Sequence, residues 1–220
     1  MEFIIDNKVR DLGIKILGVK LEGINNTTSR EFETWRKEKI SELLEKYKDY
    51  DIKSDNIIEG FYKIHEKVRV PRRKNLPASE NLIKLLAKRG ELVSINPAVD
   101  IYNIISIDSK LPLGAHDIDK VSGNVSLRLL DGSENFIPLG SDEAKEVKLG
   151  EYGFVDDNND VLCWLDIRQV DKTKVTDNTK NVIYFVIGNE ENTYEELECV
   201  ANNIIDVTTT YCGGKSTILK

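Results

Sequence analysis

The spacing of the apolar residues changes near Leu92, and this change restricts the possible folds more than any other feature of the sequence. Before it, apolar residues recur at the spacing of helices over residues 32–47, 55–68 and 79–90. After it, short apolar runs separated by turn residues predict strands at 102–107, 125–130, 134–138, 161–167 and 182–187. Two earlier strands are predicted at 2–5 and 14–21, and a last helix begins at Thr193, which forms a capping box with Glu196. We therefore expect an α+β fold, with a β-rich C-terminal core of mixed sheets flanked by helices from the N-terminal half and a C-terminal helix.

Several residues mark where these elements begin and end. Asp55 or Asn56 is expected to cap the second helix and Ser79 the third, because short polar side chains accept hydrogen bonds from the first turn. Gly90 ends the third helix. Asp131-Gly132 predicts a hairpin between the strands on either side of it. We expect residues 213–220 to form a loose tail.

The length and composition favour one domain without metals or disulfides. A chain of 220 residues buries enough apolar surface to fold alone, and we expect a single domain with parts at 1–90, 91–190 and 191–220. Three widely spaced cysteines and two histidines form no disulfide or metal pattern, so no metal and no cofactor is expected. No apolar run approaches the roughly 20 residues of a membrane span, and a signal peptide is not recognisable. We therefore expect a cytoplasmic protein without a membrane partner.

Basic residues gather between Gly60 and Gly90, although the whole chain has a net charge of −7. This segment contains nine Lys or Arg against two acidic residues. Lys and Arg bind RNA phosphates through counterion release, and flanking prolines present such side chains stiffly. We interpret four of them as RNA-binding residues: Arg69, Arg72, Arg73 and Lys74. The alternative is a solvated loop whose charge offsets nearby acids.

Two short motifs lie close together in the middle of the chain. Residues 96–103 contain Val-Asp-x-x-Asn, and residues 112–117 read Pro-Leu-Gly-Ala-His-Asp. In this order and spacing they resemble a segment of the tRNA-binding and editing domain of the phenylalanyl-tRNA synthetase beta subunit, which its third and fourth structural units form. The resemblance spans residues 63–189 and is best over 96–179. It departs at Gly114, where the family pattern has a His.

The resemblance implies a pocket for the aminoacyl end of tRNA. Asn103 and the backbone at Gly114 would position the ester, and His116 or Asp166 would assist a proton transfer. The implied substrate-binding residues are Tyr102, Asp117, Thr176 and Thr179. The family glutamate that reads a tyrosine hydroxyl falls near Tyr184 or Phe185, so tyrosine recognition is not expected here. From its place beside an apolar helical stripe, His65 is expected to be structural or exposed.

Three functions remain open from the sequence. The first is a tRNA-binding protein that hydrolyses mischarged aminoacyl-tRNA in trans, which requires only that water be held in line and the carbonyl be polarised. The second is a non-catalytic module that binds an amino acid or a similar small molecule, which Gly114 favours. The third is a structural protein that keeps the fold without the site. A complete tRNA ligase is not expected, because no class II catalytic core fits beside this domain in 220 residues.

Overall fold

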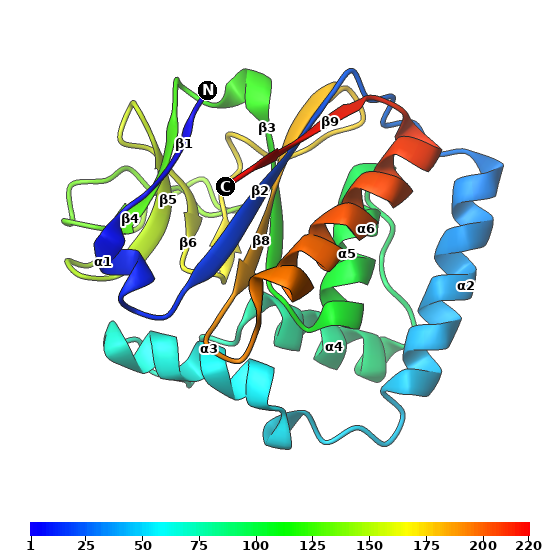
Figure 1. The fold of residues 1–220 in the computed structure, drawn as a ribbon, viewed down its shortest axis with the longest axis horizontal. Coiled ribbons are helices and arrows are strands. Elements are labelled where there is room, and N and C mark those ends of the chain that lie inside the picture. The colour runs from blue at the N-terminus through cyan, green and yellow to red at the C-terminus, as the bar shows by residue number, and fades with distance from the viewer.

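Two β-sheets pack face to face, and helices cover the outer face of one of them (Figure 1). The computed structural model describes all 220 residues. The first sheet contains, in spatial order, β1 (Phe3–Ile5), β4 (Val125–Leu129), β5 (Tyr152–Asp156), β6 (Val161–Trp164) and β7 (Arg168–Gln169). The second contains β3 (Leu113–Asp117), β8 (Asn181–Gly188), β2 (Lys15–Glu22) and β9 (Lys215–Leu219). Only β1 and β4 are parallel, so the first sheet is mixed and the second is antiparallel.

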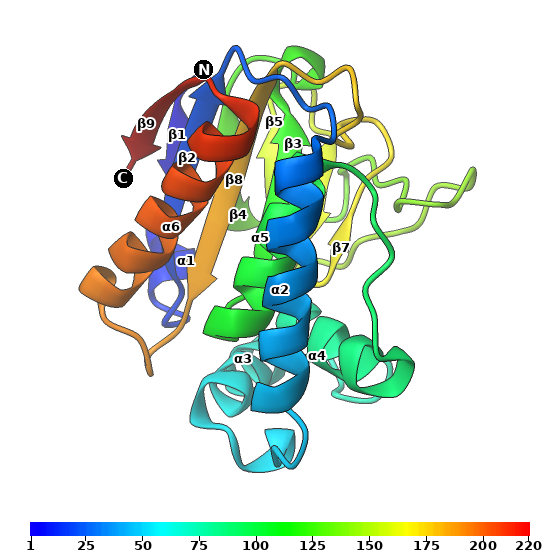
Figure 2. The same cartoon turned by 90° about the vertical axis from the view of Figure 1, so that its right-hand side faces the viewer.

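The helices form the third layer and close one end of the molecule. On the outer face of the second sheet lie α5 (Pro97–Ser109) and α6 (Tyr194–Cys212), and α2 (Arg30–Lys46) packs against α5 (Figure 2). The end of the molecule is covered by α3 (Asn56–Lys67) and α4 (Ala78–Arg89) (Figure 1). Shorter turns are α1 (Asn7–Arg10) and two 3-10 helices, Ile52–Ser54 and Ile118–Lys120. This arrangement confirms the predicted α+β fold. No helix is both long and apolar enough to cross a membrane.

Aromatic side chains fill the space between the two sheets. Phe154 of β5 and Phe185 of β8 have ring centroids 4.5 Å apart, and Phe3 of β1 lies 5.0 Å from Phe185. Phe154 and Phe185 are fully buried. Because such rings bury large apolar areas and pair favourably, this cluster stabilises the packing of the two sheets against each other.

The segment predicted as a strand at residues 102–107 is part of helix α5, so that prediction is wrong. Asn96 caps the helix by accepting a hydrogen bond from the Val99 backbone N–H at 3.1 Å, and Pro97 occupies the first turn, where proline is tolerated. Ten of the 13 helical residues are buried. A helix buried on nearly all sides loses its amphipathic pattern, and its β-branched isoleucines then resemble a strand.

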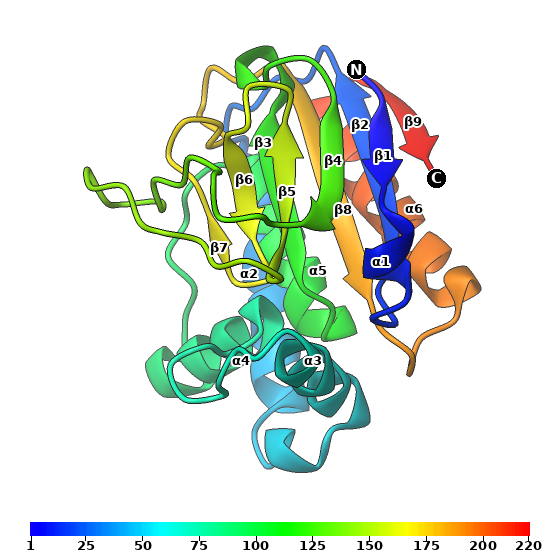
Figure 3. The same ribbon diagram turned by 90° about the vertical axis from the view of Figure 1, so that its left-hand side faces the viewer.

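Two other expectations about the middle of the chain are wrong. Ser79 does not cap α4, because the helix already begins at Ala78, after Pro77. Asp131-Gly132 does not form a tight hairpin with a strand at 134–138, where only isolated bridges occur. Instead β4 pairs with β5, and the long connection between them extends from the body of the molecule (Figure 3). The Glu134 carboxylate accepts hydrogen bonds from the Asp131 and Gly132 backbone N–H groups, each at 3.0 Å, and so turns the chain away.

The C-terminal residues form strand β9, where the sequence predicted a loose tail. Gly213 and Gly214 have φ of 69° and 96°, which reverse the chain after α6. The strand then pairs antiparallel with β2, from Gly18 opposite Leu219 to Glu22 opposite Lys215. The backbone pairing outweighs the polar composition of this segment.

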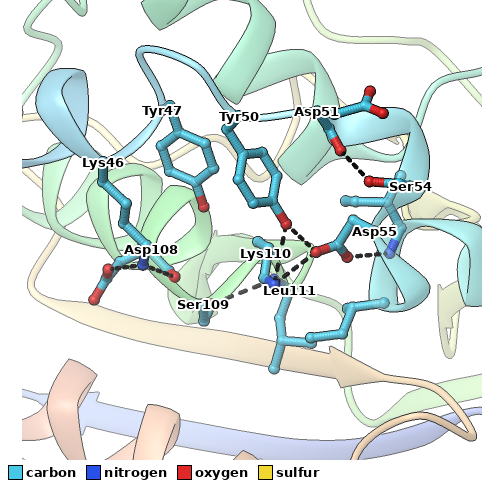
Figure 4. A network of polar contacts seen from close by, with 12 residues as sticks. Lys46, Tyr47, Tyr50, Asp51, Ser54, Asp55, Asp108, Ser109, Lys110 and Leu111 are labelled. Atoms are coloured by element: carbon cyan, nitrogen blue, oxygen red, sulfur yellow. Dashed lines mark hydrogen bonds and ion pairs between the residues drawn. The ribbon is translucent and has the colours of Figure 1, made fainter.

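A polar network joins the α2–α3 connection to the end of α5 (Figure 4). Lys110 donates to the Asp55 carboxylate at 2.6 Å, and the Tyr50 hydroxyl contacts the same oxygen. Asp55 also caps α3 by accepting from the Ile58 backbone N–H at 3.0 Å. Beside this cluster, the Tyr47 hydroxyl donates to the Ile107 carbonyl at 2.6 Å. The network fixes the end of α5 just before residues 112–114, which belong to the candidate site.

Candidate functional site

One pocket of about 450 Å³ is lined by five of the predicted catalytic and substrate-binding residues. They are Tyr102, Asn103, Gly114, His116 and Asp166. The pocket lies between α5, the second sheet and the segment that joins β6 to β7. Its volume is in the range of small-molecule sites. The apolar part of its wall includes Leu113, Phe154, Phe185 and Ile187.

Helix α5 and strand β3 supply four of these five residues, and Asp166 lies in the turn between β6 and β7. Tyr102 and Asn103 are neighbours on α5, and Gly114 and His116 are two residues apart on β3. Residues two apart on a strand point to the same face. Gly114 pairs with Phe185 on β8, which also lines the pocket. The site therefore depends on the buried helix α5 as much as on the sheet.

The side chain of Gln169 occupies the space beside Gly114. A Cβ atom at residue 114 would lie 2.7 Å from Gln169 Nε2, closer than real Cβ atoms approach other heavy atoms. Burial raises the pKa of Tyr102 to about 12, against the lowering effect of a hydrogen bond with Gln169. Sequence reasoning did not identify Gln169 as a site residue, and no local pattern marks it, because β7 brings it to β3 only in the folded chain. The carboxamide supplies a donor and an acceptor where residue 114 has no side chain.

Asp166 is the centre of a buried polar group in the pocket wall. Its Oδ1 lies 2.5 Å from His65 Nε2 and accepts from the Tyr152 hydroxyl at 2.8 Å. The side chains of Asp166 and His65 are both 0% exposed. Burial, together with the charge of Asp166, raises the pKa of Tyr152 well above its usual value, so its hydroxyl stays protonated and donates. Asp166 Oδ2 and His65 Nδ1 have no hydrogen-bond partner.

His65 is fully buried and contacts Asp166, so of the two placements expected from the sequence, structural or exposed, the exposed one is excluded. It lies on α3, 101 residues before Asp166. A separation of this length leaves no pattern in the sequence that joins the two residues. The contact instead arises because α3 lies across the end of the sheets (Figure 1).

His116 enters the pocket as a neutral imidazole. Its Nδ1 lies 2.8 Å from Thr173 Oγ1, and its Nε2 has no hydrogen-bond partner. Burial lowers the pKa of His116 to about 4. The ring therefore carries no charge near neutral pH, and its Nε2 is available for a hydrogen bond to a bound molecule.

Three of the predicted substrate-binding residues lie outside the pocket lining. Thr179 Oγ1 donates to the Asp117 carboxylate at 2.7 Å, and the Thr176 backbone N–H donates to Thr179 Oγ1 at 2.9 Å. Asp117 and Thr179 are buried in this contact. The cluster holds the 173–179 segment against the end of β3, and a role in substrate binding stays a prediction.

Of the predicted RNA-binding residues, Lys74 reaches the pocket. It lines the rim together with Arg168, and both are exposed and form no salt bridge. Arg72 instead pairs with Glu59 and Glu66 at 2.5 and 2.8 Å, which offsets its charge. Arg69 and Arg73 are exposed on the same loop. No group of three or more His, Cys, Asp or Glu side chains is placed to hold a metal ion.

Comparison with known proteins gives concordant results from sequence and from structure. A family model described as the B3/4 domain matches residues 67–196. Curated relatives include phenylalanine–tRNA ligase beta subunits. The subunit of Mycoplasma pneumoniae is 33% identical over 99 residues, which are 45% of this chain and 12% of that subunit. The subunit of Methanococcus vannielii is 34% identical over 107 residues, which are 40% of this chain and 19% of that subunit. The subunit of Fusobacterium nucleatum is 27% identical over 133 residues, 59% of this chain and 16% of its own.

A solved structure shows the same fold over nearly the whole chain. It is an N-terminal fragment of the phenylalanyl-tRNA synthetase beta subunit from Pyrococcus horikoshii, with a TM-score of 0.53 and 17% identity. The match covers 98% of this chain and 50% of that chain. This chain spans less than a fifth of the length of the three curated relatives.

Proposed function

This chain belongs to the B3/4 domain family, and on that premise we propose that it binds the aminoacyl end of tRNA and hydrolyses mischarged aminoacyl-tRNA. The observation that carries the proposal is the shared pocket of Tyr102, Asn103, Gly114, His116 and Asp166. Its apolar wall suits an amino-acid side chain, and its polar groups suit the ester and the ribose.

The charge around the pocket supports an RNA ligand. Lys74 and Arg168 come from segments far apart in the sequence and both line the pocket. Cations at that place would hold the phosphate of the terminal nucleotide. The aminoacyl group would then enter the pocket. Uniform coating with positive charge is not needed for this, which agrees with a net charge of −7.

The proposed reaction is attack of water on the ester carbonyl. The C–O bond to the ribose breaks, the ribose oxygen takes a proton, and free amino acid and tRNA are released. His116, with a pKa of about 4, is a weak base near neutral pH. Catalysis would therefore come from positioning, with Asn103, His116 Nε2 and the Gln169 amide holding the water and the carbonyl.

Deacylation of charged tRNA tests this proposal. Purified protein is incubated with tRNAs that carry correct and incorrect amino acids, and loss of the ester is followed. We expect rapid loss from one mischarged species and a large decrease of this rate in Asn103→Ala. Asn202→Ala is the matched control, because Asn202 is exposed on α6 and lines no part of the pocket. Hydrolysis no faster than the spontaneous reaction across the panel would exclude the enzyme.

RNA binding is tested separately from hydrolysis. Replacing Lys74 or Arg168 with Gln should weaken tRNA binding and lower the slope of log K against log salt by about 1 for each residue. Lys39→Gln makes the same charge change on α2, outside the pocket, and should leave the slope unchanged. Equal slopes in all variants would contradict phosphate contact at the rim.

A non-catalytic binding module is the second candidate. The low pKa of His116 and the absence of a side chain at Gly114 favour it, because both weaken proton transfer in the pocket. Saturable binding of aminoacyl-tRNA without any deacylation would identify this function.

A further inference from the structure

One carboxylate oxygen of Asp166 has two polar contacts, and the other has none. Both nearby polar groups, His65 Nε2 and the Tyr152 hydroxyl, contact Oδ1. Oδ2 is buried and unpartnered, although the residue lines the pocket. A buried carboxylate oxygen without a donor costs free energy comparable to that of a lost charged hydrogen bond. A bound molecule that donates to Oδ2 would recover that free energy.

The protein does not supply a compensating cation on the pocket side. The cations that line the pocket, Lys74 and Arg168, are exposed at its rim, and neither pairs with Asp166. His65 approaches the carboxylate only at Oδ1, and its own Nδ1 is buried without a partner. The carboxylate therefore keeps its attraction for a positive ligand group.

The group that best meets these conditions is a primary ammonium. It carries a positive charge, has three N–H donors and has no acceptor, and hydrogen bonds between such groups and carboxylates are about twice as strong as neutral ones. Phe154, Phe185 and Ile187 line the same pocket and suit an apolar side chain. An aminoacylated nucleotide has an ammonium at one end and a phosphate at the other. This matches a buried carboxylate in the wall and cations at the rim.

We infer that Asp166 binds the α-ammonium of the aminoacyl group, so that the pocket accepts amino acids with a free amine and rejects N-acylated ones. The inference rests on the proposed function, since it names how that pocket recognises its ligand. His65 and Tyr152 act as positioning residues that orient the carboxylate. Peptidyl and N-formylated esters would be disfavoured because an amide nitrogen carries no charge and has one N–H in place of three, so it makes only a weaker, neutral hydrogen bond to Oδ2.

Calorimetric titration with a matched pair of stable ligands tests the inference. Puromycin is an adenosine derivative that carries an aminoacyl group with a free ammonium, and N-acetylpuromycin lacks that charge. We expect the protein to bind puromycin at least about tenfold more tightly, which corresponds to ~1.4 kcal/mol. Asp166→Asn keeps the shape of the side chain and removes the charge. It should abolish the preference and leave the affinity for N-acetylpuromycin within about twofold.

Asp119→Asn is the matched control, because Asp119 is an exposed carboxylate outside the pocket lining. It should keep the preference for puromycin. Circular dichroism establishes that Asp166→Asn is folded, and if it is not, the preference of the unaltered protein decides the question. Equal affinities for the two ligands, no binding of either at millimolar concentration, or an unchanged preference in folded Asp166→Asn would overturn the inference.

The two proposals fail differently. If puromycin and N-acetylpuromycin bind equally while charged tRNA is still deacylated, the ammonium site is wrong and the proposed function stands. If charged tRNA is neither bound nor hydrolysed while puromycin is preferred, the pocket recognises free amines and the proposed function is wrong.

Discussion

Replacing Gly114 with alanine tests whether the Gln169 amide belongs to the binding site. The new Cβ atom would lie 2.7 Å from Gln169 Nε2 and 3.8 Å from its Cδ. Only the end of a flexible, half-buried side chain has to move, at a cost of about 0.5–1.5 kcal/mol for a lost hydrogen bond or a strained rotamer. Alanine in a strand recovers roughly 0.5–1 kcal/mol relative to glycine. The two effects nearly cancel, so we expect the melting temperature to change by less than about 4 °C.

Ligand binding should respond more strongly than stability. The displaced amide no longer offers its donor and acceptor to the ligand, which corresponds to about 0.5–1.5 kcal/mol, or roughly two- to tenfold in the puromycin dissociation constant. Calorimetric titration measures this constant, and thermal unfolding followed by circular dichroism measures stability. If the Gly114→Ala variant binds puromycin as tightly as the unaltered protein, the Gln169 amide does not contribute to binding.

The double variant with Gln169→Ala shows whether the two residues act through the same group. If Gly114→Ala acts by moving Gln169, removing the amide makes the first change harmless. The double variant should then bind no more weakly than Gln169→Ala alone, because residues that share an interaction are not additive. Losses that simply add would mean that the methyl group blocks the ligand itself.

Three further predictions concern stability. The folded-state pKa of His116, about 4, lies below its ordinary 6.5, so the unfolded state binds more protons between these values and stability falls as pH is lowered through this window. Between pH 7 and 4, His116→Asn should lose less unfolding free energy than the unaltered protein, by on the order of 3 kcal/mol. Denaturant unfolding at the two pH values measures this, and equal losses in both proteins would contradict a buried neutral ring. Asp100→Ala removes the carboxylate that lies 2.8 Å from the buried Arg36 guanidinium. It should lower the free energy of unfolding in urea by about 3–5 kcal/mol, and a loss below about 1 kcal/mol would show that water replaces the carboxylate. Gly188→Ala places a Cβ 2.6 Å from Leu197 Cδ1 between β8 and α6, and should cost about 1–3 kcal/mol, whereas an unchanged melting temperature would mean that α6 shifts freely.

The loop that carries the predicted RNA-binding residues shows how a charge pattern and a structure differ in what they specify. The sequence grouped Arg72 with Lys74 because they are two residues apart on one basic loop. In the structure Arg72 pairs with Glu59 and Glu66, whereas Lys74 lines the pocket, as Arg168 does. Counting charges in the sequence located the basic segment. It did not distinguish the cation that is neutralised from the one that is free for a ligand.

Several residues of the candidate site could be predicted because they lie in two short motifs of the sequence. Asn103 lies on one motif, and Gly114 and His116 lie on the other. They meet in the pocket because the chain passes from α5 directly into β3. Asp117 belongs to the second motif too, but it turns into a buried contact with Thr179. Position in a motif therefore did not determine which side chains line the pocket.

Features that depend on hydrogen bonds between near neighbours could be predicted from the sequence. Asp55 caps α3, Gly90 ends α4 at a φ of 72°, and Thr193 and Glu196 form the capping box of α6. Each of these choices is made within about four residues, so local side-chain chemistry is sufficient.

Features that depend on burial and on distant partners could not be predicted from the sequence and are known from the folded chain. Residues 102–107 are helical because α5 is surrounded by other elements, and the tail becomes β9 because the edge of β2 is available to it. The contact of His65 with Asp166 and the placement of Gln169 against Gly114 join residues on separate elements. Such pairs leave no periodic trace, since the free energy that holds them comes from packing of the whole chain. The polar chemistry of the pocket is therefore a property of the fold.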